Sequence, residues 1–365
     1  MNASELNNFI VILIYGSLVL LSLLKLANPL QVNKKANLWF GIFLFLWSTF
    51  WLDEVLSLIT HHSIEVNSIL WVGFIQFLTP IVFYFSVLFY TNPTFRFKIS
   101  HLRVLILPVI FLTILLLIKA GYHQLHYVII SLILFQALFY SGLSYFTIRK
   151  HQRKIQQFAA NTEGINLNWL EYIILIILIV SILYVIYNLA YNANSLNFFI
   201  NMIFLSVIYF VAYNSMKQKE IYPVEEKQRE ELISISNSET EEIKRKLISD
   251  EDLLRIKTQL EKLMEAQKPY LDSELNLIKL SKELSVSTHH LSYVINTGFR
   301  KNFFQYINEY RIDYAKKLLK DNSNNKLSIL GIAYESGFNS KTSFNTTFKK
   351  FTDQTPSEFK NSSDL

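Results

Sequence analysis

Two short helices joined by a tight turn are predicted by one stretch, Ile332-Ala333-Tyr334-Glu335-Ser336-Gly337-Phe338-Asn339-Ser340-Lys341-Thr342-Ser343-Phe344-Asn345-Thr346-Thr347-Phe348-Lys349-Lys350. Gly337 can adopt the left-handed backbone conformation with which a helix ends abruptly. Ser340 is of a type that caps the start of a helix. Phe344 and Phe348 stand four residues apart, so they share one face of the second helix and are expected in the core. The stretch therefore predicts a helix-turn-helix unit.

A second unit of the same design is predicted further upstream. An amphipathic helix runs from Leu277 to Leu284, the turn Ser285-Val286 follows, and Ser287 caps another helix that extends to about Asn296. A long helix from Phe303 to Leu319 joins the two units. The C-terminal part of the chain is thus expected to be entirely helical.

This arrangement is suited to DNA, because an α-helix fits the major groove while the preceding helix braces it across the backbone. The exposed face of the later second helix carries hydrogen-bonding and basic groups, Lys341, Thr342, Asn345, Thr346 and Lys349. The earlier one offers Thr288, His289, Ser292, Tyr293 and Asn296. Two such helices on a rigid connector can read successive turns of one groove face, about 34 Å apart.

At this point the sequence resembles a known family, the DNA-binding domain of AraC/XylS-type transcription regulators, over Leu275–Phe359. The resemblance rests on Leu277-x-x-Leu280, Ser287-x-x-x-Leu291, Phe303-x-x-Tyr306-Ile307-x-x-x-Arg311-Ile312, Ile332-Ala333-Tyr334-Glu335-x-Gly337-Phe338-Asn339-Ser340 and Thr355-Pro356-Ser357-Glu358-Phe359. It implies about seven helices with two recognition helices. The positions that match the family's base-reading residues are His289, Ser292, Tyr293, Lys341, Thr342, Asn345 and Thr346.

The N-terminal part has a different composition. Residues 1–214 hold 11 Lys/Arg and 6 Asp/Glu, whereas the remaining 151 residues hold 24 and 23. A helix needs about 20 apolar residues to cross the hydrocarbon layer of a membrane. Seven stretches meet this requirement, at about 9–27, 37–59, 68–90, 101–119, 124–147, 170–192 and 197–214. Pro80 and Pro108 fall inside the third and fourth, where they are expected to kink the helices.

The basic residues of the short loops predict the orientation of these spans. With the N-terminus outside, the cytoplasmic segments carry eleven Lys/Arg: Lys34, Lys35, Arg96, Lys98, Arg103, Arg149, Lys150, Arg153, Lys154, Lys217 and Lys219. The outer segments carry only Lys119. The sequence therefore predicts an N-terminus outside the cytoplasmic membrane of a bacterium and a C-terminal domain in the cytoplasm.

Ionisable residues inside a membrane are costly and often functional. Asp53 and Glu54 lie near the outer end of the second span, and Lys119 ends the fourth. One interpretation is an outward-facing signal pocket in which Lys119 neutralises one carboxylate, with Gln76, His126 and Asn188 at similar depth. The alternative is that these side chains reach the interface or make structural hydrogen bonds between helices.

A charged segment connects the two parts. The residues Ser234-Ile235-Ser236-Asn237-Ser238 are expected to break a solvated helix, and Ser249-x-x-Asp252 indicates the start of another. In that helix Leu253, Ile256, Leu260 and Leu263 form a stripe, which either packs on the following domain or changes pairing between protomers. The predicted organisation is a seven-helix transmembrane sensor domain (1–214), a linker (215–249) and a soluble double helix-turn-helix domain (250–365).

Several classes of function are disfavoured. The chain has no Cys and only 9 Gly, and it lacks the phosphate-binding, zinc-protease and serine-hydrolase motifs, so we expect neither an enzyme nor a metal or cofactor site. The sequence favours a membrane-embedded transcription regulator that senses a small-molecule or envelope signal. Its expected partners are promoter DNA, membrane lipid and a second copy of the chain. The alternative is a receptor or transporter whose cytoplasmic tail binds a protein instead of DNA.

Overall fold

The structure is a computed structural model that describes residues 3–62, 70–190, 196–223, 225–237, 247–321 and 327–362. These residues form helices and connecting turns and no strands, which confirms the predicted all-helical class. The chain divides into two compact units, Met1–Lys150 with Leu167–Ile221, and His151–Asn166 with Tyr222–Leu365. The segment His151–Asn166 thus belongs to the C-terminal unit, although it lies between two helices of the N-terminal one.

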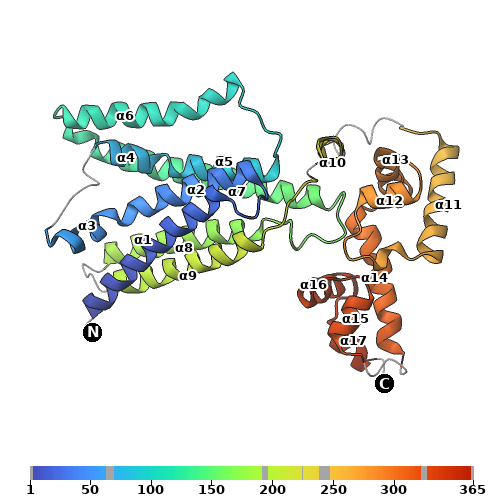
Figure 1. Ribbon diagram of the computed structural model, residues 1–365. Coiled ribbons are helices and arrows are strands. Elements are labelled where there is room, and N and C mark those ends of the chain that lie inside the picture. The colour runs from blue at the N-terminus through green and yellow to red at the C-terminus, as the bar shows by residue number, and fades with distance from the viewer. Residues whose placement is uncertain are drawn as a thin grey trace. The chain divides into compact units, whose positions relative to one another are not determined.

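The N-terminal unit consists of nine labelled α-helices within the described residues (Figure 1): α1 (Ala3–Ala27), α2 (Lys34–Ser48), α3 (Leu52–Thr60), α4 (Leu70–Phe77), α5 (Thr79–Thr91), α6 (Ile106–Lys119), α7 (His126–Ile155), α8 (Asn168–Ala190) and α9 (Leu196–Lys217). Helix α7 extends by its last residues, from His151, into the C-terminal unit. The second expected span corresponds to α2 and α3 with a 3-10 turn between them, and the third to α4 and α5.

Six helical stretches of the described residues are long and apolar enough to cross a membrane: Glu5–Ala27, Lys34–Thr60, Leu70–Thr91, Ile99–Lys119, His123–Ile155 and Phe198–Lys217. They correspond to six of the seven expected spans. The seventh, at 170–192, falls on α8, whose described apolar run Asn168–Ile179 is shorter than a span. Residues 191 and 192 lie outside the described part, and this span stays a prediction.

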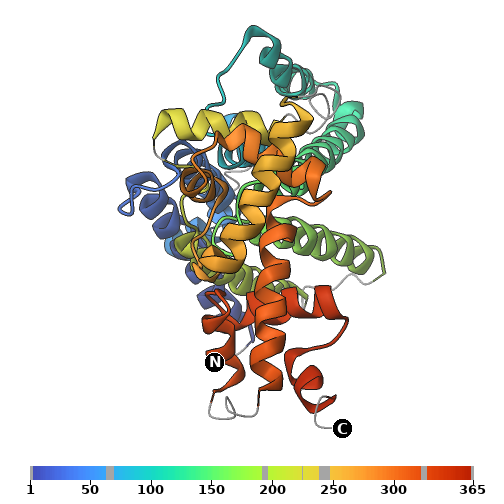
Figure 2. The same ribbon diagram turned by 90° about the vertical axis from the view of Figure 1, so that its right-hand side faces the viewer.

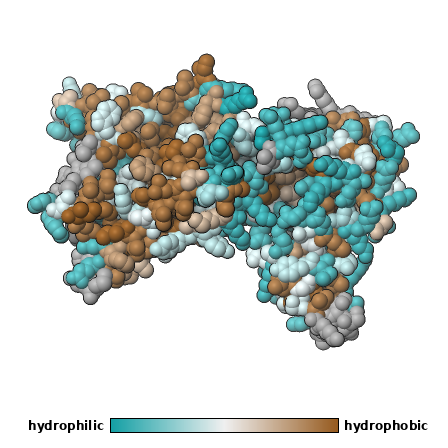
Figure 3. Space-filling model, in the orientation of Figure 1, coloured by the Kyte–Doolittle hydropathy of each residue, from teal (hydrophilic) through white to brown (hydrophobic). Residues whose placement is uncertain are grey.

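The surface of these helices is apolar. Figure 3 shows hydrophobic residues spread over the N-terminal helices and a predominantly hydrophilic surface on the C-terminal unit. Ile99, Trp71 and Phe146 expose 87%, 63% and 71% of their surface. Soluble proteins rarely expose apolar surface so extensively, whereas lipid tails solvate it well. The side chains that face outward are therefore compatible with a membrane.

Helix α1 packs against α2 and α9, and α2 packs on α5 with its other side (Figure 1). The Lys25 ammonium donates a hydrogen bond to the Ser215 carbonyl at 2.6 Å, which links α1 to the last turns of α9. The third span breaks at Leu78, beside Pro80, as the sequence predicts. Pro108 instead lies in the first turn of α6, which follows a 3-10 segment at Ile99–Leu105. Proline is tolerated in the first turn of a helix, because an N–H there would have no partner within the helix.

The C-terminal unit contains α10 (Glu226–Asn237) and seven further α-helices within the described residues: α11 (Asp250–Ala266), α12 (Leu277–Glu283), α13 (Thr288–Tyr293), α14 (Phe303–Lys320), α15 (Ile329–Glu335), α16 (Lys341–Thr352) and α17 (Pro356–Ser362). The long helix α14 runs between the α12–α13 pair and the α15–α16 pair (Figures 1 and 2). It contacts α15, α16 and α17, and also the turn that follows α13. Both helix pairs are therefore attached to the same long helix, α14.

The described part of the connecting segment is more helical than the sequence predicts. The expected break at Ser234–Ser238 is wrong over its first four residues, because α10 continues through Asn237, and Ser238 lies outside the described residues. Leu232, Ile235 and Ser236 are buried against the rest of the unit, and this burial outweighs the low helix propensity of the polar residues. Helix α11 buries Ile256 and Leu260 of the expected stripe together with Met264, whereas Leu253 and Leu263 are half-buried. This packing agrees with the interpretation in which the helix packs on the domain that follows.

Candidate DNA-binding interface

The α15–α16 pair is built as its sequence predicts. Gly337 has φ +81°, and a Cβ atom there would lie 2.5 Å from the Tyr270 carbonyl oxygen, so only glycine fits this turn. The Ser340 hydroxyl accepts a hydrogen bond from the Ser343 N–H at 3.1 Å and caps α16. Phe344 and Phe348 are fully buried in a cluster with Ile332, Ala333 and Phe338. This core fixes which face of α16 remains outside.

The outer face of α16 carries four of the five side chains that the sequence singled out as exposed groups, Lys341, Thr342, Thr346 and Lys349. The fifth, Asn345, is half-buried, and its Oδ1 atom has no hydrogen-bond donor within the described residues. Two cations, two hydroxyls and an amide on one helical face are the groups that contact phosphates and base edges. The face is thus chemically suited to DNA.

The α12–α13 pair has the expected caps but is less accessible. The Ser287 hydroxyl accepts from the His290 N–H at 3.1 Å and caps α13. His289 and Tyr293 are half-buried, and Ser292 is only 7% exposed. The Ser234 hydroxyl on α10 lies 3.2 Å from His289 Nε2, within hydrogen-bond distance. Helix α10 therefore covers part of the face that would enter a groove.

Arg311 ties α14 to the turn before α12. Its side chain is 1% exposed, and its Nε and Nη2 groups donate to the carbonyls of Tyr270 and Asp272 at 2.7 and 2.8 Å. Burial lowers the pKa of this guanidinium to about 10, so it remains charged at neutral pH. The guanidinium also lies over the Phe338 ring at 5.6 Å. One buried cation on α14 thus contacts both the turn before α12 and the Phe338 ring in the core of the α15–α16 pair.

The segment 156–163, between α7 and α8, is a further part of this unit that sequence reasoning missed. The first N–H groups of a helix have no partner within it. Here the Leu277 N–H, at the start of α12, donates to the Phe158 carbonyl, and the Phe304 N–H, at the start of α14, donates to the Gln156 carbonyl, both at 2.9 Å. The segment therefore completes two helix N-termini of the DNA-binding domain.

The same segment is anchored by side chains. Asn308 of α14 is 1% exposed, and its amide donates to the Ala160 carbonyl at 2.9 Å. Phe158 and Ala160 are buried as well. Glu163 accepts a hydrogen bond from the Ser340 hydroxyl, which places a carboxylate at the N-terminus of α16. The apolar run Phe158-Ala159-Ala160 in an otherwise polar loop is the sequence signal that would have revealed this docking.

Of the three residues singled out as a signal site, one lines a cavity, and the site itself stays a prediction. Glu54 is exposed and lines a cavity in the N-terminal unit, whereas Asp53 and Lys119 do not line it. No ion pair between Lys119 and Glu54 or Asp53 is found among the described residues, and neutralisation of a carboxylate by Lys119 stays a prediction. Gln76 lines the same cavity, and the side chain of Asn188 lies outside the described part. No group of His, Asp and Glu in the described chain is arranged to hold a metal ion.

Comparison with known proteins agrees with this description of the C-terminal unit. Residues 280–362 match the family described as helix-turn-helix domain. An uncharacterized HTH-type transcriptional regulator of Staphylococcus aureus strain COL is 34% identical over 91 residues, which are 25% of this chain and 12% of that protein. One from Pseudoalteromonas carrageenovora is 35% identical over 88 residues, which are 24% of this chain and 50% of that protein.

The chain thus spans at most half the length of these relatives, and each similarity covers about a quarter of the chain. No solved structure is significantly similar to the chain. The family match covers the part in which the structure has its capped helix pairs. The C-terminal part of this chain is therefore an AraC-type helix-turn-helix DNA-binding domain, preceded by helices that are long and apolar enough to span a membrane.

Proposed function

We propose that this chain is a membrane-embedded one-component transcription regulator, in which a signal sensed by the transmembrane helices controls binding of specific double-stranded DNA. The main support for this proposal is the exposed polar face of α16 within a domain that matches the helix-turn-helix family. Regulators of this family are generally not enzymes. The excess of Lys and Arg in alternate loops supports an N-terminus outside the bacterial cytoplasmic membrane and a DNA-binding domain inside.

In the DNA complex Lys341, Thr342, Asn345 and Thr346 contact base edges from α16, and Lys349 contacts the backbone. His289, Ser292 and Tyr293 do the same from α13 once α10 has moved. Residues 268–365 carry 14 Lys/Arg and 10 Asp/Glu, a modest excess for a DNA-binding domain. Two copies held in one membrane would raise the effective concentration of the second domain, so we propose that the chain acts as a homodimer.

Control operates through the two segments that hold the recognition helices. Helix α10 covers α13, and the 156–163 segment places the Glu163 carboxylate at the start of α16, where a DNA phosphate would otherwise meet the helix N-terminus. A carboxylate there repels the DNA backbone. Helix α7 leads directly into this segment, and its last residue, Ile155, is buried in the C-terminal unit. A movement of α7 can therefore release or seat the segment.

A signal shifts this equilibrium only if it binds the two states with different affinity. The docked state described above is the one with low affinity for DNA. Release of Glu163 and α10 exposes both recognition helices together. Regulation thus reduces to a competition between an internal carboxylate and a phosphate for one helix N-terminus.

The test is DNA crosslinking and immunoprecipitation of the full chain in its host. We expect enrichment of discrete promoter regions, loss of that enrichment in Lys341→Glu with membrane insertion intact, and increased enrichment in Glu163→Gln. Glu335→Gln is the matched control, since it removes the same charge from an exposed site on α15. An unchanged pattern in Lys341→Glu would refute DNA reading by α16. Equal effects of Glu163→Gln and Glu335→Gln would refute the specific competition.

A further inference from the structure

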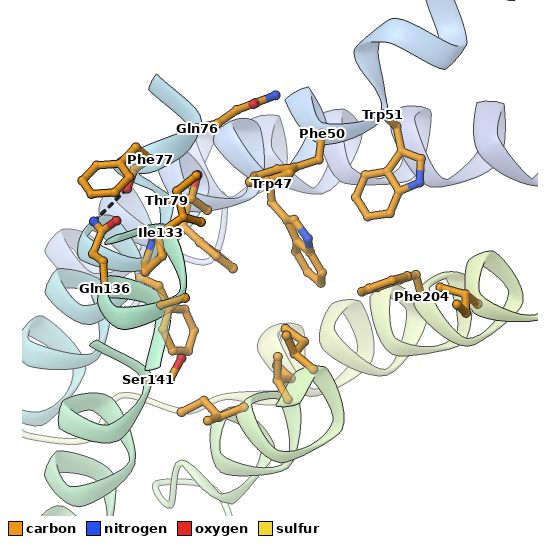
Figure 4. A pocket seen from close by; sticks show the side chains of 18 of the residues that line it. Trp47, Phe50, Trp51, Gln76, Phe77, Thr79, Ile133, Gln136, Ser141 and Phe204 are labelled. Carbon is orange, nitrogen blue, oxygen red and sulfur yellow. Dashed lines mark hydrogen bonds between the residues drawn. The ribbon is translucent and has the colours of Figure 1, made fainter. Parts of the chain in front are cut away.

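The N-terminal unit contains a cavity of about 630 Å³ between α2, α3, α4, α5, α7, α8 and α9. Its size falls within the range of about 300–1,000 Å³ that is typical of small-molecule sites. Figure 4 shows Trp47, Phe50 and Trp51 on one side of the cavity and Phe204 of α9 facing them. The walls are largely aromatic and aliphatic, so an occupant needs an apolar body.

The cavity adjoins the break in the third span, which leaves polar groups beside it. The Gln136 amide of α7 donates to the Phe77 carbonyl at 2.8 Å and so satisfies one of them (Figure 4). Thr79 is 6% exposed and lines the cavity, but its hydroxyl has no hydrogen-bond partner within the described residues. A buried hydroxyl without a hydrogen-bond partner is unfavourable.

The described residues that line the cavity carry negative charge and no positive charge. Glu54 is the one ionisable side chain among the twenty described residues that line the cavity, and it is exposed. A carboxylate or phosphate ligand would meet a like charge there, without a cation to offset it. A ligand with a positive charge would gain an ion pair in a region of reduced dielectric constant.

Aromatic rings that line the same cavity as Glu54 strengthen the preference for a cation. The centroids of Trp51 and Phe204 lie 5.4 Å apart, and those of Trp47 and Phe204 lie 6.3 Å apart. The Trp51 indole N–H donates to Asn201 Oδ1 at 3.3 Å, which fixes the orientation of its ring. Ring faces attract ammonium groups, most strongly where water is excluded.

We propose that this cavity binds a small amphiphilic organic cation, with its ammonium group at Glu54 and its apolar or aromatic body among Trp47, Trp51 and Phe204. The proposal that a ligand binds here depends only on the cavity and its lining residues. Its identification as the signal site rests on the proposed regulatory function. Occupancy would then fix the spacing between α7 and the helices that face it across the cavity, and α7 continues into the segment docked on the DNA-binding domain.

The experiment is equilibrium binding to the full chain in phosphatidylcholine nanodiscs. The radiolabelled probes are 4-phenylbutylammonium, the neutral 4-phenylbutan-1-ol and the anionic 4-phenylbutyrate. We expect saturable binding of the ammonium, at least tenfold weaker binding of the alcohol, and none of the carboxylate. Glu54→Gln should weaken ammonium binding at least tenfold, whereas Asp53→Asn, which removes the adjacent carboxylate that does not line the cavity, should change it less than twofold.

Several results would overturn the proposal. These are absence of saturable binding, equal affinity for alcohol and ammonium, and equal effects of the two variants. The comparison of the three probes on the unmodified chain does not depend on how any variant folds. DNA binding of the same nanodiscs is measured separately: ammonium binding that leaves DNA affinity unchanged refutes the signal assignment and leaves the site in place.

Discussion

Asn308 is the residue whose replacement should most clearly release the 156–163 segment. Asn308→Leu keeps the branched shape of the side chain but removes the amide that donates to the Ala160 carbonyl, and Ala160 is only 2% exposed. A buried carbonyl without a donor costs about 2 kcal/mol. Because each 1.4 kcal/mol is tenfold in an equilibrium constant, the undocked population of the segment should rise roughly 30-fold.

Hydrogen exchange of the full chain in nanodiscs measures this population directly. The Leu277 and Phe304 amides are bonded to carbonyls of the segment, so they exchange when it undocks. Both should exchange roughly 30-fold faster in Asn308→Leu. The Ile332 amide, which bonds to the Ser328 carbonyl within the α15 end of the domain, should keep its rate. Lys317→Leu, at an exposed position on the same helix, is the matched control.

Two outcomes would refute this reasoning. If the Leu277 and Phe304 amides keep their rates in a folded Asn308→Leu chain, the Asn308 amide does not hold the segment. If all three amides accelerate equally, loss of the Asn308 amide destabilises the whole domain, and the claim that Asn308 specifically holds the segment is wrong.

Three further predictions concern the DNA-binding domain. Gly337→Ala should destabilise it by more than about 2 kcal/mol, measured by denaturant-dependent proteolysis, because φ is positive and the new Cβ meets the Tyr270 carbonyl; full stability would contradict the turn geometry. Phe348→Ala should cost about 3–5 kcal/mol in the same assay, since the ring is fully buried; a loss below 1 kcal/mol would be inconsistent with its place in the core. Lys349→Gln should lower the slope of log K against log salt by about 0.9 with unchanged sequence preference, as expected for one phosphate contact; an altered preference would instead indicate base contact.

The sequence predicts the DNA-binding domain well because its signals are local. Ser340 and Ser287 mark helix starts through bonds to residues three positions away, and Gly337 marks a turn through its own backbone angle. Helix boundaries follow from such neighbours without knowledge of the rest of the fold. The identity of the buried face of α16 follows in the same way from Phe344 and Phe348.

The remaining features depend on contacts between distant residues. Asn308 and Ala160 are 148 positions apart, and no local pattern specifies that they meet. Leu232 and Ile235 hold α10 in place through burial against residues that propensity does not consider. The cavity depends on the rotation of seven helices about their axes, so Glu54 lines it while the adjacent Asp53 does not. Periodicity predicts the existence of each helix but not which of its faces its neighbours meet.

The central claim is that a chain held in a membrane reads DNA sequence through its C-terminal domain. Selection from a random pool of duplexes by the full chain in nanodiscs tests it most directly. We predict an enriched motif with two elements about one helical turn apart, and loss of the enrichment in Lys341→Glu. No enriched motif from a folded, inserted chain, or the same motif from Lys341→Glu, would contradict the account.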